Sequence, residues 1–200
     1  MHAKNPRPLE ARDLIPGAFT IDGVLTIDEC AALIAMAERA GFSDAPVTTA
    51  RGPVMMPDLR DNSRAMIDDP DCAQALWARI APCFKPRGRW RPVGLNERLR
   101  FYRYDPGQRF APHRDGHFAR SADERSFVTL LVYLNGDCQG GHTRLIGADV
   151  APRAGAALCF DHELLHEGAP VTSGRKLVLR SDVMFRRAPT TLIHLDSLNF

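Results

Sequence analysis

Two stretches in the first half of the chain repeat apolar residues at helical spacing. The first begins at Thr26–Glu29, which has the form of a capping box because a threonine is followed three residues later by a glutamate. The repeat ends at Gly41, a residue type common just beyond a helix terminus. Its apolar members are Ile27, Ala31, Ile34 and Ala37. The pattern therefore predicts a helix between Thr26 and Gly41.

The second helical stretch follows Asp69-Pro70, which supplies an N-cap residue and a proline at the first helical position. Its apolar stripe consists of Cys72, Leu76, Ile80 and Cys83. Between the two helices, residues 43–64 mix glycine, proline and polar side chains without a clear period. We expect a loop there, with at most one short strand.

After residue 95 the pattern changes to short runs rich in β-branched and aromatic residues. Predicted strands lie at Arg98–Tyr104, Phe127–Leu134, Thr143–Leu145, Ala156–Phe160 and Lys176–Phe185. Turn-forming residues, mostly glycine with proline, asparagine or aspartate, separate these runs. Short strands with glycine-rich corners favour a sandwich or jelly roll.

These patterns predict an α+β protein with a mainly β core. Residues 1–94 would form a helical N-terminal support region of the same domain, with its helices packed outside the core formed by residues 95–186. Residues 187–200 would form a C-terminal tail, whose apolar segment 192–195 is able to dock as a strand or a helix. A chain of 200 residues with 44% apolar content suits one compact domain.

Charge and cysteine content narrow the class of protein only a little. The net charge of +2 is too small to indicate a nucleic acid or an anionic membrane as the partner. The five cysteines are odd in number and form no CxxC pair, which argues against a disulfide framework or a zinc ribbon. No apolar run reaches the roughly 18 residues that a membrane span needs, and the first sixteen residues are too polar for a secretory signal. A cytoplasmic protein is expected.

Five of the seven histidines fall within residues 113–166, inside the predicted β core. On an extended segment His113 and Asp115 project from the same face, so both could bind one ion. His166 ends an apolar run and precedes a loop, which suits it as a third ligand. Two imidazoles and one carboxylate make a facial triad, the arrangement associated with non-haem Fe(II) oxygenases because it leaves coordination positions open.

Lys176 lies ten residues beyond His166, at the start of the last predicted strand. Its neighbours in sequence are apolar, and a buried ammonium is costly without an anionic partner. A small dicarboxylate that chelates the metal with one end could reach Lys176 with the other. Arg180 shares the strand face of Lys176 by the period of two and would add a second cation.

Three segments together resemble the catalytic core of the prolyl-4-hydroxylase-type Fe(II)/2-oxoglutarate dioxygenases. They are RFYRYDPGQRFAPHRDGHF, VTLLVYLNGDCQGGHTRL and VAPRAGAALCFDHELLHEGAPVTSGRKLVLRSDVMF, and they cover residues 95–186 approximately. The HxD motif, the GGxT corner, HEGxPV and the lysine ten residues after the histidine occur in the family's order. Residues 60–77 also resemble the helical prelude of bacterial members.

The resemblance implies a double-stranded β-helix in which His113, Asp115 and His166 hold Fe(II). It implies 2-oxoglutarate and O2 as cosubstrates, with Lys176 paired to the distal carboxylate of 2-oxoglutarate. Tyr104 and Tyr133 match positions where family members often place a hydrogen bond to the cosubstrate. The expected reaction is hydroxylation of an unactivated C–H bond, with release of succinate and CO2.

Arg180 stands where the peptide hydroxylases often have a small or neutral residue, so we expect it to contact substrate or cosubstrate. His162 is either a contact beside the site, to the substrate or to a ligand, or a core histidine satisfied by the backbone. His117 and His142 are expected to be bystanders. The segment with Arg60, Asn62 and Arg64 is a candidate lid over the site. Seven further arginines cluster near the predicted site, and they form either an ion-paired face or contacts for an anionic substrate. They are Arg98, Arg100, Arg103, Arg109, Arg114, Arg120 and Arg125.

Two other functions fit parts of the pattern. A cupin-like metalloenzyme that does not use 2-oxoglutarate would more often carry three or four histidines and would not need Lys176. A non-catalytic iron and 2-oxoglutarate sensor could use the same fold. The substrate stays open among a peptide, a free amino acid, another small metabolite and a modified nucleobase, because loops outside the motif select it. The resemblance favours an amino acid or peptide and does not favour nucleic acid or a membrane.

Overall fold

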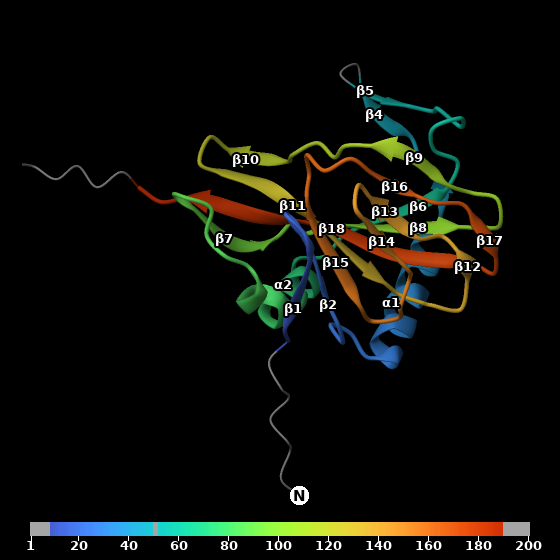
Figure 1. The fold of residues 1–200 in the computed structure, drawn as a ribbon, viewed down its shortest axis with the longest axis horizontal. Coiled ribbons are helices and arrows are strands. Elements are labelled where there is room, and N and C mark those ends of the chain that lie inside the picture. The colour runs from blue at the N-terminus through green and yellow to red at the C-terminus, as the bar shows by residue number, and fades with distance from the viewer. Residues whose placement is uncertain (1–8, 50–51, 190–200) are drawn as a thin grey trace, which may run out of the picture.

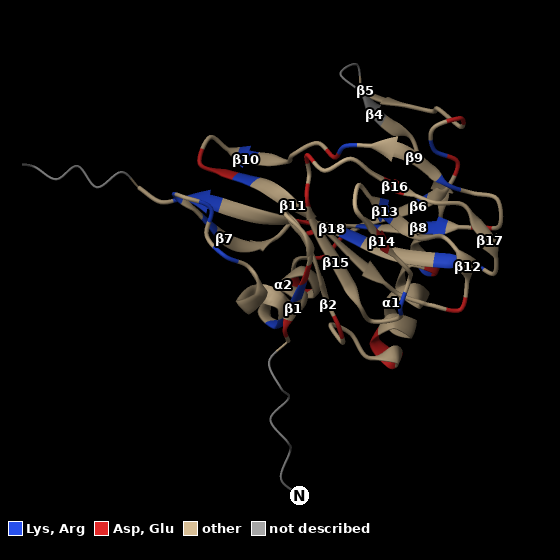
Figure 2. Cartoon of the chain, viewed as in Figure 1, with Lys and Arg blue, Asp and Glu red and all other residues tan. Residues whose placement is uncertain are grey.

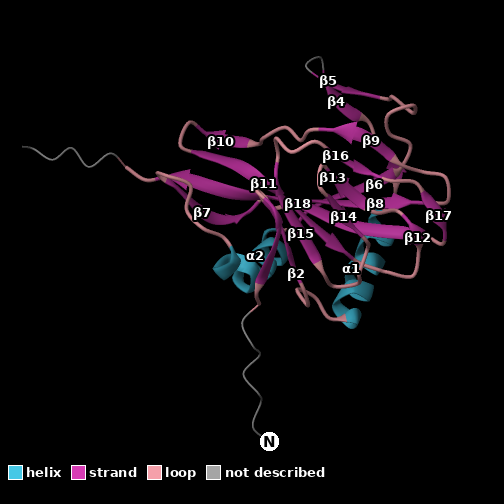
Figure 3. Ribbon diagram, viewed as in Figure 1, coloured by secondary structure: helices cyan, strands magenta, loops and turns pink. Residues whose placement is uncertain are grey.

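The computed structural model describes residues 9–49 and 52–189, which form two stacked β-sheets with helices on one side (Figures 1 and 3). The main sheet has the order β1-β2-β15-β11-β18-β8-β6-β3, with β10 beside β11 and β7 beside β18. Its strands are β1 (Ala11–Ile15), β2 (Ala18–Ile21), β15 (Ala157–Asp161), β11 (Glu124–Tyr133), β18 (Lys176–Arg187), β8 (Arg98–Tyr104), β6 (Ser63–Asp68), β3 (Ser43–Asp44), β10 (Ala119–Ser121) and β7 (Trp90–Leu95).

A smaller antiparallel sheet has the order β14-β13-β16-β9. Its strands are β14 (Ala148–Val150), β13 (Thr143–Leu145), β16 (His166–Gly168) and β9 (Phe110–His113). Two further strand pairs are β12 (Gln139–Gly140) with β17 (Val171–Ser173), and β4 (Val47–Thr49) with β5 (Gly52–Val54). This layered, antiparallel arrangement agrees with the predicted jelly-roll core.

Both predicted helices are present, with the predicted caps. Helix α1 (Ile27–Ala40) begins at a complete capping box between Thr26 and Glu29. Helix α2 (Pro70–Ile80) begins at Asp69, whose side chain accepts a hydrogen bond from the backbone N–H of Cys72. A short 3-10 helix, Ala81–Cys83, follows α2. Neither α-helix in the described ranges is long and apolar enough to cross a membrane.

The buried stripe of α1 differs from the predicted one. Its core-facing residues are Cys30, Leu33 and Ala37, whereas Ile27 is 67% exposed. The segment before the helix sets this rotation, because the Leu25 N–H donates to the carbonyl of Gly155 and Leu25 is buried. A side chain at Gly155 would bring its Cβ to 2.1 Å from the Leu25 carbonyl oxygen, so this contact requires glycine.

Residues 1–94 are not only helical, which corrects the description drawn from the sequence. Three strands from this region pair with strands of the core: β2 with β15, β6 with β8, and β7 with β18. These strands are short and gain their hydrogen bonds from segments far along the chain, so their local sequence carries little periodic signal. The apolar segment 192–195 lies outside the described residues.

Strand β11 shows how the main sheet separates a core face from a second, partly polar face. Val128, Leu130 and Val132 belong to the apolar core that includes the buried faces of both helices. Thr129 and Leu131 alternate with them and face the cavity on the opposite side of the strand.

The neighbouring strands β18 and β8 follow the same alternation. In β18, Leu177 and Leu179 lie in the core, while Lys176 and Arg180 line the cavity. The chemically active side chains therefore gather on the face of the main sheet that the smaller sheet covers.

Candidate functional site

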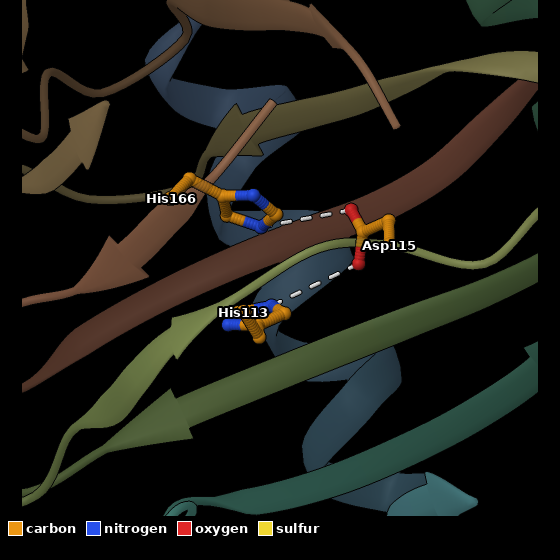
Figure 4. A group of neighbouring side chains, drawn as sticks. All are labelled: His113, Asp115 and His166. Carbon is orange, nitrogen blue, oxygen red and sulfur yellow. Dashed lines mark ion pairs between the residues drawn. The ribbon is translucent and has the colours of Figure 1, made fainter. Parts of the chain in front are cut away.

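His113, Asp115 and His166 come together at the edge of the smaller sheet. His113 ends β9 and His166 begins β16, and the two residues are directly paired in the antiparallel register. Asp115 lies two residues after His113, and its carboxylate faces both imidazoles (Figure 4). One ligand atom from each residue lies within 4.8 Å of the others. The ladder between β9 and β16 thus brings together residues that are far apart in the sequence.

Hydrogen bonds orient both imidazole rings in the same way. The Nδ1–H of His113 donates to the carbonyl of Ala111 at 2.8 Å, and that of His166 donates to the carbonyl of Leu164 at 2.9 Å. This tautomer leaves each Nε2 with a free lone pair facing Asp115, at 3.8 Å from Oδ1 for His113 and 3.6 Å from Oδ2 for His166. Backbone carbonyls commonly orient metal-binding histidines in this way.

The electrostatic environment keeps these rings neutral. Burial, together with the neighbouring His166, lowers the pKa of His113 to about 4 despite the opposing effect of Asp115. Burial also lowers the pKa of His166. A metal ligand must be deprotonated, so both imidazoles are in the form that binds a metal at neutral pH.

The Asp115 carboxylate is held in its ionised form from two sides. Its Oδ2 accepts a hydrogen bond from the Thr129 hydroxyl at 2.6 Å, and its Oδ1 lies 2.9 Å from Nη1 of Arg180. Burial alone would raise the pKa of Asp115, but Arg180, His166 and the Thr129 hydroxyl together bring it well below the usual range. The sequence analysis did not single out Thr129, whose position on the cavity face of β11 was the available signal.

His162 supports the same carboxylate from behind. Its Nδ1 lies 2.9 Å from the Thr129 hydroxyl and its Nε2 lies 2.8 Å from the Ser126 hydroxyl, while its carbonyl accepts the Asp115 N–H. Of the two expectations for His162, these contacts favour a role beside the cluster of His113, Asp115 and His166, through Thr129, over a core histidine satisfied by the backbone.

Lys176 lies deep in the cavity between the two sheets and is only 3% exposed. Its ammonium donates to the carbonyl of Gly141 at 2.5 Å and lies 5.1 Å and 5.7 Å from the ring centroids of Tyr104 and Tyr133. Within residues 9–49 and 52–189, no carboxylate lies within 4.0 Å of this ammonium. Burial lowers the pKa of Lys176 to about 8. An anionic group entering the cavity would find an unpaired cation there.

The glycine corner before β13 makes room for that lysine. Gly141 has a φ of +65°, and a Cβ there would lie 3.1 Å from the Lys176 side chain and 3.1 Å from Val171. Tyr104 lines the cavity with Lys176. Tyr133 instead donates its hydroxyl to Thr143 at 2.8 Å, and burial raises its pKa above the ordinary range.

The other residues that the sequence analysis singled out lie partly beside the site and partly at the surface. Arg60 and Asn62 are 4% and 1% exposed, and Arg60 and Arg64 line a cavity beside His113 and Asp115, so this segment forms part of the wall of the site; its action as a lid stays a prediction. His142 pairs with Asp149 at the surface, and His117 is one of the residues that line the same cavity beside His113 and Asp115. Several of the clustered arginines form ion pairs, which agrees with the expectation of an ion-paired face. The pairs are Arg98 with Asp68, Arg103 with Asp105, and Arg120 with Glu97 and Glu124.

Comparison with known proteins agrees with this geometry. Residues 99–181 match the model of the 2OG-Fe(II) oxygenase superfamily. A PKHD-type hydroxylase from Acaryochloris marina is 29% identical over 172 residues, which cover 80% of this chain and 74% of the relative. The matched segment contains His113, Asp115, His166 and Lys176, and both comparisons fit a prolyl-4-hydroxylase-type 2OG-Fe(II) oxygenase. The chain is an oxygenase of the prolyl hydroxylase type, which depends on iron and 2-oxoglutarate.

Solved structures of other 2OG-Fe(II) oxygenases share the fold. A prolyl-4-hydroxylase from Pseudomonas putida is 26% identical with a TM-score of 0.58, and the match covers 86% of this chain and 94% of that one. The viral collagen prolyl hydroxylase of Paramecium Bursaria Chlorella virus-1, solved with 2-oxoglutarate, is 22% identical with a TM-score of 0.58, covering 84% and 96%. The jelly-roll prediction is confirmed, and neither the cupin-like enzyme nor the sensor is favoured.

Proposed function

We propose that His113, Asp115 and His166 hold the catalytic Fe(II), and that Lys176 binds the distal carboxylate of 2-oxoglutarate. The observation that carries the proposal is the convergence of three ligand atoms within 4.8 Å, on the same side of the sheet as an unpaired buried ammonium. Two neutral imidazoles and one carboxylate fit Fe(II) as a facial triad. Tyr104 lines the cavity next to Lys176 and is the better placed of the two tyrosines to contact the cosubstrate.

The chain's own residues prepare the site for this reaction. The carbonyls of Ala111 and Leu164 hold both Nε2 atoms toward the metal position, and Thr129 and Arg180 hold the carboxylate there. Positions fixed in this way reduce the reorganisation needed when the ligands bind. Bound iron and 2-oxoglutarate supply the oxidising chemistry, in which 2-oxoglutarate and O2 yield succinate, CO2 and a hydroxylated substrate.

For the substrate, we favour a C–H bond of an amino acid, free or within a peptide. The support is the similarity to hydroxylases, among them a probable prolyl 4-hydroxylase of Arabidopsis thaliana that is 26% identical over 85% of this chain. A nucleic acid or a membrane is not favoured as partner. A cytoplasmic location, which the unpaired cysteines suit, stays a prediction.

An anaerobic titration with Fe(II) and 2-oxoglutarate tests the ligand assignment. The wild type should develop the metal-to-ligand charge-transfer band of a chelated cosubstrate, and His166→Ala should not. His142→Ala removes a surface histidine paired with Asp149 and should keep the band, which controls for loss of any imidazole. A wild type without the band, or an undiminished band in His166→Ala, would contradict the assignment. Succinate release and a product heavier by one oxygen atom would then report turnover.

A further inference from the structure

A second cavity of about 280 Å³ opens beside the metal ligands. It shares His113, Asp115 and Arg180 with the cavity that contains Lys176, so the two cavities meet at the proposed iron site. A molecule in this second cavity would therefore lie next to the position where oxidation occurs. Five arginines contribute to its lining: Arg60, Arg64, Arg100, Arg114 and Arg180.

The lining carries a local excess of positive charge. Its acidic members are Asp115 and Asp182, so five arginines against two aspartates leave three positive charges in excess. Asp182 is already shared between Arg100 at 3.0 Å and Arg180 at 3.3 Å, and Asp115 is the proposed iron ligand. The whole chain has a net charge of only +2, and its basic and acidic residues are interspersed (Figure 2). The excess of positive charge is therefore a feature of this cavity and not of the chain as a whole.

Arg60 is a fixed cation at the wall of the cavity. Its guanidinium lies 4.5 Å from the ring centroids of both Tyr102 and Phe110, and its Nε donates to Asn62 at 2.8 Å. The side chain is 4% exposed, and its Nη2 has no hydrogen-bond partner among the described residues. A buried, oriented and unpartnered N–H donor is costly unless a ligand accepts from it.

Arg64 adds a second unpaired guanidinium. No carboxylate of the described ranges lies within 4.0 Å of Arg60 or Arg64. Burial lowers the pKa of Arg64, and the like charges of Arg60, Arg100 and Arg180 lower it further. Like charges held this close repel one another, so their arrangement favours an anion between them.

The pKa of Tyr102 reflects the same excess of positive charge. Burial would raise the pKa of its hydroxyl, but the positive charges of Arg180, Arg60 and Arg100 outweigh burial and lower it. An ionisable group on a different strand from Arg60 and Arg64 thus also experiences a positive potential.

We propose that this cavity binds an anionic group, a carboxylate or a phosphate, of a small organic substrate, and that Arg60 and Arg64 are the residues that receive it. The inference rests on the proposed function, since it takes the substrate to react at the iron site. A small molecule fits because Arg60 is nearly inaccessible from outside and the cavity is limited in size. An internal proline of a peptide is neutral and would leave both guanidinium groups unpaired.

The first experiment measures oxyanion binding without knowledge of the substrate. Thermal unfolding of the wild type, with Mn(II) and 2-oxoglutarate present, is compared in sodium acetate, sodium phosphate and sodium chloride at matched ionic strength and pH. Acetate or phosphate should raise the midpoint by about 2–4 °C over chloride. Whichever of the two anions gives the larger shift identifies the carboxylate or the phosphate as the preferred group.

Two variants separate this cavity from general salt effects. Arg64→Gln should lose the oxyanion shift, whereas Arg12→Gln, on exposed strand β1 and outside the cavity lining, should keep it. In chloride, Arg64→Gln should unfold no earlier than the wild type, because it relieves repulsion between like charges. An equal oxyanion shift in wild type and Arg64→Gln would overturn the proposal, as would a large loss of stability of Arg64→Gln in chloride.

The second experiment compares matched probes that differ in one charge. N-acetyl-L-proline should bind the wild type at least about tenfold more tightly than its neutral methylamide, and Arg64→Gln should remove most of that preference. Tighter or equal binding of the methylamide would overturn the proposal, and so would an acid that does not bind. Tighter binding of a capped Asp-Pro peptide than of N-acetyl-L-proline would overturn the assignment to a small molecule. If the charge-transfer band forms but these preferences are absent, only this inference fails.

Discussion

The two faces of the main sheet use the same strands for opposite purposes. Toward the helices, β8, β11 and β18 present mainly apolar side chains, among them Phe101, Leu130 and Leu179. Toward the smaller sheet, alternate residues of the same strands carry a hydroxyl, an ammonium and a guanidinium at Thr129, Lys176 and Arg180. Both faces are buried. The comparison shows that stability and chemistry can be assigned to alternate positions of one strand, because side chains point to opposite faces with a period of two.

The largest expected effect is on the apolar face. Leu179 is fully buried in the core, so Leu179→Ala should reduce the free energy of unfolding by about 2–5 kcal/mol. Chemical denaturation measures the change. Iron affinity of the folded variant should remain near that of the wild type. A large loss of iron affinity in protein that is still folded would show that the two faces are not separable.

The next effect concerns the carboxylate on the polar face. Asp115→Asn keeps the shape of the side chain and removes its charge, so the affinity for Fe(II) should fall by about 100-fold or more. This loss exceeds the roughly 10–100-fold that is typical when a residue that only orients a metal ligand is replaced. Anaerobic metal titration measures this, with circular dichroism to confirm that the variant is folded. Iron affinity within a few-fold of wild type would remove Asp115 from the ligand set.

Lys176 should give a pH dependence in which stability and binding change in opposite directions. Its pKa is about 8 in the folded protein and near 10.5 ordinarily, so between these values the unfolded chain binds more protons and stability rises with pH. Binding of 2-oxoglutarate requires the ammonium, so its affinity should be constant below pH 8 and fall by up to about tenfold per pH unit well above it.

Calorimetric titration across this pH range gives the affinity, and denaturation gives the stability. Lys176→Met should bind 2-oxoglutarate weakly at every pH and should lose the rise in stability. A wild-type affinity that does not change between pH 7 and 10 would contradict the pairing of Lys176 with the cosubstrate.

The smallest effect is expected at Thr129. Thr129→Val keeps the size of the side chain but leaves Asp115 and His162 without the hydroxyl between them. Iron affinity should fall by about tenfold. Thr129→Ser retains the hydroxyl and should restore most of it, which a purely structural role for the methyl group would not predict.

Much of the site could be predicted from the sequence because its residues lie in ordered motifs. The positions of His113, Asp115, His166 and Lys176 follow from spacing and from the family resemblance, and the structure brings the first three together. The caps of both helices were also predictable, since Thr26 and Asp69 act through residues three positions away.

What could not be predicted depends on contacts between distant segments. The buried face of α1 is set by Leu25 against Gly155, far along the chain. The buried position of Arg60 depends on the rings of Tyr102 and Phe110, which lie on other strands. The pairing of Arg180 with Asp115 likewise arises only once the segment that follows β9 approaches β18.

The hydrogen bonds behind Asp115 have a single possible direction. The Phe118 N–H must donate to the Ser126 hydroxyl, and the carboxylate can only accept from Thr129. The Thr129 hydroxyl has one hydrogen and gives it to Asp115, so the Nδ1–H of His162 donates to Thr129. Burial lowers the pKa of His162, and in the neutral ring Nε2 accepts from the Ser126 hydroxyl. Every hydrogen in the row therefore points toward the carboxylate of Asp115, the proposed metal ligand. The row behaves as a string of aligned dipoles whose positive end meets the carboxylate, a side-chain counterpart of a helix N-terminus built across two loops and a strand.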